Sequence, residues 1–139
     1  MSTHVDPVRT YTIDDPKAWF QRLNQYIYLG DVVDHTHNST ISIGFGRYGS
    51  GEENPWNMTY DEALIITKGT FTVRDTYGSA TAHAGDVIFL PKGADVVYQA
   101  DTDVELVYVS YPHWFDAASN SPHVHRLEEF QPSAPPARN

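Results

Sequence analysis

Hydrophobic and polar residues alternate over short stretches along most of the chain, and this pattern predicts β-strands. Between residues 41 and 46, the large apolar side chains of Ile41, Ile43 and Phe45 alternate with small or polar residues. Gly, Pro, Asn and Asp separate such runs at intervals of roughly ten residues, which is typical of a β-sandwich or barrel. The predicted strands cover residues 26–29, 32–33, 41–45, 64–67, 71–73, 87–90, 96–98 and 104–111.

Two turns are predicted between these runs. Asp-Thr-Tyr-Gly at 75–78 predicts a hairpin turn, because Asp and Gly tolerate the backbone angles that such turns require. Pro-Lys-Gly at 91–93 predicts a tight corner where a strand ends. No internal repeat is visible, so the sequence predicts one barrel rather than two.

One short helix is predicted near the N-terminus. Asp15 can cap it, Pro16 suits its first turn, and Trp19, Phe20 and Leu23 would share one face. The expected organisation is an N-terminal segment with this helix (1–25), a β-barrel (26–118) and a polar, proline-rich C-terminal tail (119–139), of which the last ten or so residues should be loose.

The composition fits one domain and excludes several classes of function. The chain has 139 residues, nine basic and eighteen acidic side chains, a net charge of −9 and no cysteine. The negative charge argues against nucleic-acid binding and disfavours anionic membranes. The absence of cysteine excludes disulfides, thiolate metal sites and a cysteine nucleophile. The chain shows no signal peptide and no apolar run near the roughly 20 residues that span a bilayer, so we expect a cytoplasmic protein.

Two segments resemble the motifs of the cupin superfamily. Residues 85–93, Gly-Asp-Val-Ile-Phe-Leu-Pro-Lys-Gly, resemble the second cupin motif, in which a Gly precedes a Pro-x-Gly corner. Glu62, followed by Ala-Leu-Ile-Ile-Thr-Lys and Gly69, resembles the end of the first motif. The resemblance implies an all-β, single-domain jelly-roll barrel, also called a double-stranded β-helix, here with a short N-terminal helix.

Two further stretches are similar to the EutQ-type cupins of ethanolamine utilisation. These are Trp-Asn-Met-Thr-Tyr-Asp-Glu at 56–62 and Leu-Val-Tyr-Val-Ser-Tyr-Pro at 106–112. The likeness covers residues 27–115. It raises acyl-phosphate chemistry with ATP, because that family has been linked to acetate kinase activity. Cupin barrels commonly dimerise, so we expect a homodimer.

The chain departs from metal-binding cupins at the ligand positions. Those proteins supply His-x-His shortly before the Glu and a third His after the Pro-x-Gly corner. Here residues 55–58 are Pro-Trp-Asn-Met and the later position is Val96, so only Glu62 remains. One carboxylate cannot hold a transition metal, because stable sites need three or four N, O or S ligands. EutQ-type cupins share this loss, and we expect no metal or other cofactor at the usual site.

Glu62 is the leading candidate for chemistry. It begins an apolar strand, and the cupin resemblance implies that it points into the barrel. Burial raises the pKa of a carboxyl group, which suits a general acid or base near neutral pH. Tyr60 or Tyr98 would be its partner in proton transfer. The alternative is a Glu paired with an Arg or a Tyr hydroxyl for structural reasons.

Substrate contacts are predicted mainly from the aromatic residues. The chain holds nine Tyr and three Trp, and Tyr offers both an apolar ring and a polar group to a ligand. Core and dimer packing is the alternative for most of them. Arg47 either faces inward, towards Glu62 or a substrate carboxylate, or outward as a surface charge. The predicted substrate-binding residues are Trp56, Met58, Arg47, Tyr48, Tyr108 and Trp114.

Two histidine pairs leave a second site open. His35 and His37, and likewise His123 and His125, have a spacing that a strand could place on one face. Together they could form a four-imidazole metal site. The alternative is that both pairs lie in exposed polar connections, away from the strands that line the barrel.

The leading hypothesis is therefore a metal-independent cupin enzyme of the isomerase, lyase or cyclase type, acting on a small molecule, with organic acids among the candidates. The alternatives are a non-catalytic small-molecule-binding cupin, a EutQ-like acetate kinase, or a metal enzyme that uses Glu62 with the spare histidines.

Overall fold

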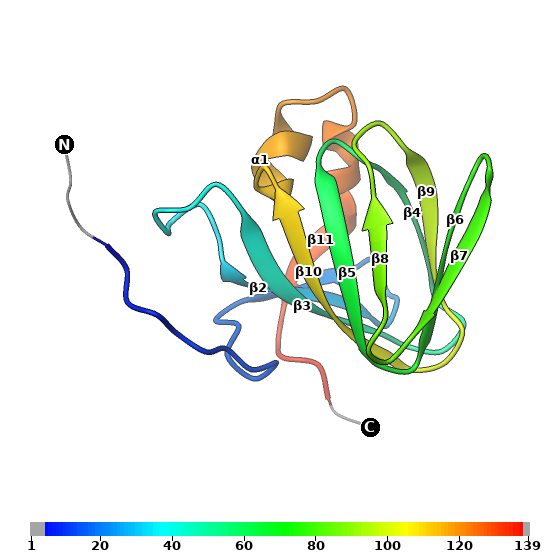
Figure 1. The fold of residues 1–139 in the computed structure, drawn as a ribbon, viewed down its shortest axis with the longest axis horizontal. Coiled ribbons are helices and arrows are strands. Elements are labelled where there is room, and N and C mark those ends of the chain that lie inside the picture. Colours follow the sequence, from blue (N-terminus) through cyan, green and yellow to red (C-terminus); the bar gives the residue numbers. More distant parts are fainter. Residues whose placement is uncertain (1–4, 138–139) are drawn as a thin grey trace.

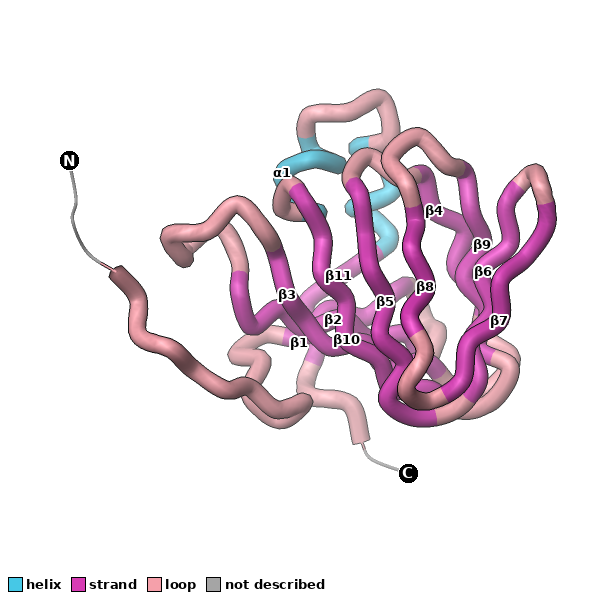
Figure 2. Tube along the Cα trace, in the orientation of Figure 1, coloured by secondary structure: helices cyan, strands magenta, loops and turns pink. Residues whose placement is uncertain are grey.

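A computed structural model describes residues 5–137, which form two antiparallel β-sheets that face one another (Figures 1 and 2). The seven-stranded sheet has the order β11-β1-β2-β3-β10-β5-β8, and the four-stranded sheet has the order β4-β9-β6-β7. The strands are β1 (Trp19–Arg22), β2 (Ile27–Val33), β3 (Ser42–Tyr48), β4 (Glu53–Asn57), β5 (Asp61–Lys68), β6 (Thr70–Asp75), β7 (Gly78–His83), β8 (Val87–Leu90), β9 (Asp95–Ala100), β10 (Val104–Tyr111) and β11 (Phe130–Ser133). The prediction of an all-β fold is confirmed.

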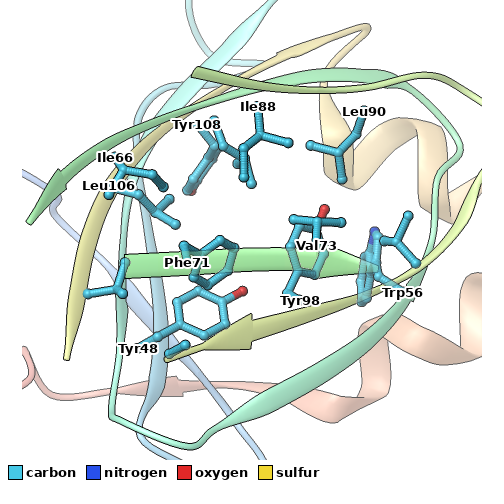
Figure 3. Packing of buried hydrophobic residues seen from close by; sticks show 14 of the residues in the cluster. Tyr48, Trp56, Ile66, Phe71, Val73, Ile88, Leu90, Tyr98, Leu106 and Tyr108 are labelled. Atoms are coloured by element: carbon cyan, nitrogen blue, oxygen red, sulfur yellow. The ribbon is translucent and has the colours of Figure 1, made fainter. Parts of the chain in front are cut away.

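The core lies between the two sheets, because alternate side chains of each strand point inward. On β5, Glu62, Leu64 and Ile66 are buried while their neighbours face outward or are partly exposed. Figure 3 shows that aliphatic and aromatic side chains of the two sheets meet across this interior. From the seven-stranded sheet come Ile66, Ile88, Leu90, Leu106 and Tyr108, and from the four-stranded sheet Trp56, Phe71, Val73 and Tyr98.

The predicted hairpin is confirmed. β6 pairs with β7 in register from Thr70 with His83 to Asp75 with Gly78. The Asp75 carboxylate accepts hydrogen bonds from the backbone N–H groups of Tyr77 and Gly78, which fixes the turn. Gly78 has a φ of +151°, and this is a conformation that favours glycine.

The predicted N-terminal helix is wrong. Residues 19–22 form strand β1, which pairs with β2 on one side and with β11 on the other. Trp19 and Arg22 are buried, whereas Leu23 is exposed, has a φ of +48° and ends the strand. Pairing with the adjacent β2 and with the distant β11 outweighs a local helix signal of one or two turns, because so short a helix has little stability of its own.

The predicted polar C-terminal tail contains regular structure, and the prediction of a loose end is wrong over residues 130–133. Helix α1 (Trp114–Ser119) and a 3-10 helix (Val124–Glu129) follow β10 and lie at one end of the two sheets (Figure 1). The chain then returns as β11 and pairs with β1 from Phe130 opposite Arg22 to Ser133 opposite Trp19. Among the described residues, no helix is long and apolar enough to cross a membrane.

Candidate functional site

The candidate site is a pocket in the interior between the two sheets. The three predicted catalytic residues, Tyr60, Glu62 and Tyr98, line it together. Four of the predicted substrate-binding residues line it as well: Tyr48, Trp56, Tyr108 and Trp114. Its free volume is about 30 Å³, which is room for about two water molecules. The structure therefore brings these seven side chains to one place, and their roles stay predictions.

Glu62 is the acidic group of this pocket. β5 places it at the inner face, where its side chain is only 7% exposed. Its Oε1 accepts a hydrogen bond of 2.7 Å from the Tyr98 hydroxyl. Burial raises the pKa of Glu62 from 4.5 to about 7, although the hydrogen bond from Tyr98 acts in the opposite direction. Glu62 can therefore both release and accept a proton near neutral pH.

The phenols around Glu62 remain protonated at that pH. Burial and the nearby Glu62 carboxylate raise the pKa values of Tyr60 and Tyr98 well above 10. The Tyr60 hydroxyl accepts a hydrogen bond of 2.9 Å from Trp56 Nε1. Tyr98 lies on β9 and Tyr60 directly precedes β5, so two separate segments hold the phenols beside the acid. The Tyr60 hydroxyl can donate a hydrogen bond to a ligand, whereas the Tyr98 hydroxyl already donates to Glu62. Neither phenol acts as a base near neutral pH.

Two predicted substrate-binding residues do not line the pocket. Met58 is buried next to Tyr98, with its sulfur 3.4 Å from the Tyr98 hydroxyl. Arg47 is buried on the other side of the sheet, where its Nη2 lies 3.5 Å from Glu105 Oε2 and its Nη1 donates to the Pro136 carbonyl at 3.4 Å. Neither prediction for Arg47 holds, because it neither faces Glu62 nor extends into solvent.

Asn54 and Phe130 line the pocket and were not predicted. Asn54 lies two residues before Trp56 on β4, so a strand predicted through Trp56 would have placed Asn54 on the same inner face. Its Oδ1 is buried and has no hydrogen-bond partner among the described residues. Phe130 could not have been identified, because it lies in a segment whose polar, proline-rich composition predicted a tail.

Tyr108 connects the pocket with a second carboxyl group, Asp31, on β2. The Tyr108 ring lines the pocket, and its hydroxyl donates a hydrogen bond to Asp31 Oδ1. Trp114 Nε1 donates to the same oxygen at 3.0 Å. The Tyr108 ring lies against Gly44 of β3, where a Cβ would overlap the ring. Glycine at this position therefore allows Tyr108 to reach Asp31.

The residues present do not fit the metal that cupins commonly hold. Beside Glu62, the pocket offers phenols and one amide, and none of its lining residues is a histidine. Within residues 5–137, no group of three or more His, Asp or Glu side chains is arranged to hold a metal ion.

The four-imidazole site is not formed either. The His35 ring packs edge-on against His113, with centroids 5.6 Å apart. His123 and His125 contact each other instead, with centroids 6.4 Å apart, at the 3-10 helix.

Comparisons with known proteins identify the family. A family model described as "Ethanolamine utilisation protein EutQ" matches residues 22–117. Proteins named acetate kinase EutQ from Salmonella typhimurium and Escherichia coli are each 33% identical to this chain, over 84 and 87 residues. These matches cover 60% of this chain but only 36% of each relative, so the chain spans about a third of their length.

Solved structures agree with this match. The crystal structure of ethanolamine utilization protein Q from Salmonella typhimurium is 31% identical, with a TM-score of 0.62 over 68% of this chain and 79% of the other. The EutQ protein of Clostridium difficile is 23% identical, with a TM-score of 0.65 over 74% and 73% of the two chains.

Ectoine synthase from P. lautus is 17% identical, with a TM-score of 0.63 over 84% of this chain and 82% of the other, which supports the fold alone. A cupin domain of Schizosaccharomyces pombe Cnp3, 13% identical, has a TM-score of 0.60 over 77% of this chain and 76% of the other. With the family match over most of its length, this chain belongs to the EutQ family and has the cupin fold that its sequence motifs predicted.

Proposed function

We propose that the interior pocket binds a small organic molecule and that Glu62 exchanges a proton with it, as in a metal-independent isomerase, lyase or cyclase. The observation that carries this proposal is a buried carboxyl group whose pKa is raised to about 7 by desolvation. A group with such a pKa is present in both protonation states near neutral pH, which is the condition for general acid–base catalysis.

The hydrogen bonds of the pocket leave specific atoms for a ligand. Tyr98 donates to Oε1 of Glu62, so Oε2 is the oxygen that would take a proton from the substrate or give one to it. The unpaired Oδ1 of Asn54 would accept a hydrogen bond from a ligand hydroxyl or amine. A buried acceptor without a donor is costly, and a bound ligand would remove that cost.

The size of the pocket limits the substrate. A free volume of about 30 Å³ admits only a few heavy atoms unless side chains move. Trp56, Trp114 and Phe130 pack edge to face at one side of the pocket, with centroids of Trp56 and Phe130 5.7 Å apart. Rotation of these rings is the change that would admit a larger ligand.

Acetate kinase activity receives less support from this pocket. The relatives that carry this name are about three times longer than the matched segment. Phosphoryl transfer requires cations around the phosphate groups, and none of the residues that line the pocket is Lys or Arg.

Proton transfer can be tested before the substrate is known. The protein would be incubated in D₂O with small carbonyl compounds such as pyruvate, acetaldehyde and dihydroxyacetone, and deuterium uptake at the carbon beside the carbonyl group would be followed by NMR. We expect catalysed exchange in at least one compound, its loss in Glu62→Gln, and its retention in Glu53→Gln, whose carboxylate pairs with Arg74 at the surface.

Two results would contradict the proposal. Ligand binding without exchange, unchanged by Glu62→Gln, would indicate a non-catalytic binding protein. ATP-dependent phosphorylation of acetate that persists in Glu62→Gln would place the chemistry elsewhere in the molecule.

We also propose that the chain forms a homodimer through the outer face of the seven-stranded sheet. Cross-strand pairing places eight apolar residues there in two rows. The rows are Phe45–Val107–Ile65–Val87 and Ile43–Val109–Ala63–Phe89. Val87 and Phe89 are 61% and 65% exposed, and contiguous apolar surface of this kind is typical of an interface.

A second copy fits this face because the eight residues carry no charge, whereas the chain carries −9. Two copies can therefore meet there without bringing acidic groups together. Light scattering should give the mass of a dimer for the natural chain and of a monomer for Phe89→Lys. Tyr77→Lys, at the exposed β6–β7 turn, should remain dimeric. A monomeric natural chain would exclude the proposed dimer.

A further inference from the structure

A second cavity lies outside the two sheets and is much larger than the interior pocket. This groove has a volume of about 370 Å³, which is within the range of small-molecule sites. Arg9 and Lys17 contribute to it from the N-terminal segment, Asp31 from β2, His35 from the β2–β3 connection and His113 from the residue before α1. In Figures 1 and 2 the N-terminal segment runs past this connection before it enters β1.

The acidic groups of the groove already have hydrogen-bond donors. Asp15 accepts a hydrogen bond of 2.6 Å from the Thr12 N–H. Asp34 accepts hydrogen bonds from the N–H and the hydroxyl of Thr36, at 2.9 and 2.6 Å. Asp31 accepts hydrogen bonds from Trp114 and Tyr108, as described above. These carboxylates are therefore held by the chain itself and do not need a ligand.

Among the basic groups of the groove, His37 lies 3.2 Å from Asp34 Oδ1, whereas Arg9 and Lys17 have no acidic partner among the described residues. Within residues 5–137, Arg22, Arg47, Arg74 and Arg126 each pair with a glutamate. Arg9 has no ion pair in that part of the chain, and neither does Lys17. A chain with eighteen acidic and nine basic residues thus leaves two cations unpaired in the same cavity.

His113 adds an unused polar group to the inner wall. Its side chain is only 7% exposed, and neither ring nitrogen has a hydrogen-bond partner among the described residues. Its Nε2 lies 3.8 Å from Asp31 Oδ2, which is beyond hydrogen-bond distance. Buried polar groups are normally paired, so an unpaired imidazole in the wall of a cavity indicates a place where a ligand atom can bind.

Aromatic rings form the apolar part of the groove. Phe20, Trp114 and Phe115 line it, and the rings of Trp114 and Phe115 meet edge to face with centroids 5.7 Å apart. Such surfaces favour a flat apolar group on the ligand. The groove therefore combines unpaired cations with an aromatic wall.

We propose that this groove binds a small organic anion, with its carboxylate or phosphate group held by Arg9 and Lys17 and its apolar body against Trp114 and Phe115. The proposal goes beyond the proposed function, because the groove does not include Glu62 and does not depend on its chemistry. Carboxylate and phosphate share the same recognition by Arg and Lys, so the experiment has one arm for each.

The test uses three probes with the same ring: benzoate, phenyl phosphate and neutral benzyl alcohol. Each would be titrated into ¹⁵N-labelled full-length protein, and backbone and indole N–H signals would be followed by NMR. We expect benzoate or phenyl phosphate to shift the signals of Arg9, Lys17, His35 and the Trp114 indole, and benzyl alcohol to have little effect. The tighter of the two anions identifies the preferred group.

Two double variants with equal charge give a matched control. Arg9→Gln with Lys17→Gln should weaken anion binding by at least about tenfold, because hydrogen bonds to charged groups are lost. Lys68→Gln with Lys92→Gln, at exposed positions outside the groove, should change it little. Equal weakening by both pairs, equally tight binding of benzyl alcohol, or shifts centred on Glu62 and Tyr98 would each overturn the proposal.

Discussion

Glu62 is a buried carboxyl group in the interior pocket, and Asp31 is a partly buried one in the groove outside the sheets, so their surroundings differ. Glu62 accepts one described hydrogen bond, from Tyr98. Asp31 accepts hydrogen bonds from Tyr108 and Trp114 and has His113 nearby. Burial raises the pKa of both groups, but for Asp31 the two donors and His113 oppose that effect. The charged form of Asp31 therefore has more groups that stabilise it than the charged form of Glu62 has.

The largest expected effect is the pH dependence of the free energy of unfolding that Glu62 causes. Its folded pKa of about 7 exceeds 4.5, so the folded state binds the proton more tightly than the unfolded state. The stability from this group is present below about pH 4.5 and is lost as the pH rises to about 7, by about 3 kcal/mol in total. Glu62→Gln should lack this loss.

Urea unfolding at about pH 5 and about pH 8 measures the difference. Asp31 titrates in both proteins, so its contribution cancels in the comparison. Glu53→Gln, at the surface, should behave like the natural chain. Parallel pH profiles for Glu62→Gln and the natural chain would mean that Glu62 is ionised in the folded state at ordinary pH.

Replacing Gly44 tests the contact between the pocket and Asp31. A Cβ at Gly44 would overlap the Tyr108 phenol and lie 2.7 Å from the Gly30 carbonyl oxygen, so Gly44→Ala should cost about 1–3 kcal/mol. Gly46→Ala, on the same strand, would place its Cβ 2.9 Å from a methyl group of Leu106, which can shift. Thermal unfolding should rank Gly44→Ala as clearly less stable than Gly46→Ala, and equal melting temperatures would count against a fixed position of Tyr108.

Tyr98→Phe tests the hydrogen bond to Glu62. Removing the hydroxyl should cost about 1 kcal/mol and raise the pKa of Glu62 above about 7, because this hydrogen bond lowers it. Tyr60→Phe keeps the donor to Glu62 and serves as the control. An NMR titration of the Glu62 side chain gives its pKa in both variants. An unchanged pKa in Tyr98→Phe would show that the hydrogen bond is absent.

The smallest expected effect is on the pKa of Asp31, in the groove outside the sheets. His113 lowers the pKa of Asp31 by its charge, so His113→Gln should raise that pKa. His35→Gln should leave the pKa of Asp31 unchanged and alter the stability by no more than about 0.5 kcal/mol, because His35 is exposed. NMR titration of Asp31 compares the two variants. A larger change of the Asp31 pKa in His35→Gln than in His113→Gln would show that His35, and not His113, interacts with Asp31.

Short alternating runs predicted the all-β fold, and the cupin resemblance together with the aromatic residues predicted most of the candidate site. The cupin resemblance placed Glu62 inside the barrel and Trp56 at the usual ligand positions, and the motif around the Pro-x-Gly corner indicated the cupin architecture. The opposition of Glu62 and Tyr98 agrees with that architecture, since β5 and β9 belong to different sheets that face each other.

The remaining features depend on contacts between distant parts of the chain. β1 and β11 pair across more than 100 residues, so a local pattern at Trp19 indicated a helix and the segment around Phe130 indicated a tail. Burial at the end of β3 could not show which way Arg47 points, because Gly46, Arg47 and Tyr48 are all buried although neighbouring side chains lie on opposite sides of the sheet. The groove beside Asp31 joins the N-terminal segment with residues near α1, and no motif connects them.

The pKa of Glu62 in the folded protein tests the account most directly. Selective ¹³C labelling of glutamate side chains and an NMR titration from about pH 4 to pH 9 would measure it, with Glu62→Gln assigning the signal. The account predicts a value of about 7, well separated from the other glutamates. A value near 4.5 would show that Glu62 is ionised like a surface carboxylate, and acid–base chemistry at this residue would lose its basis.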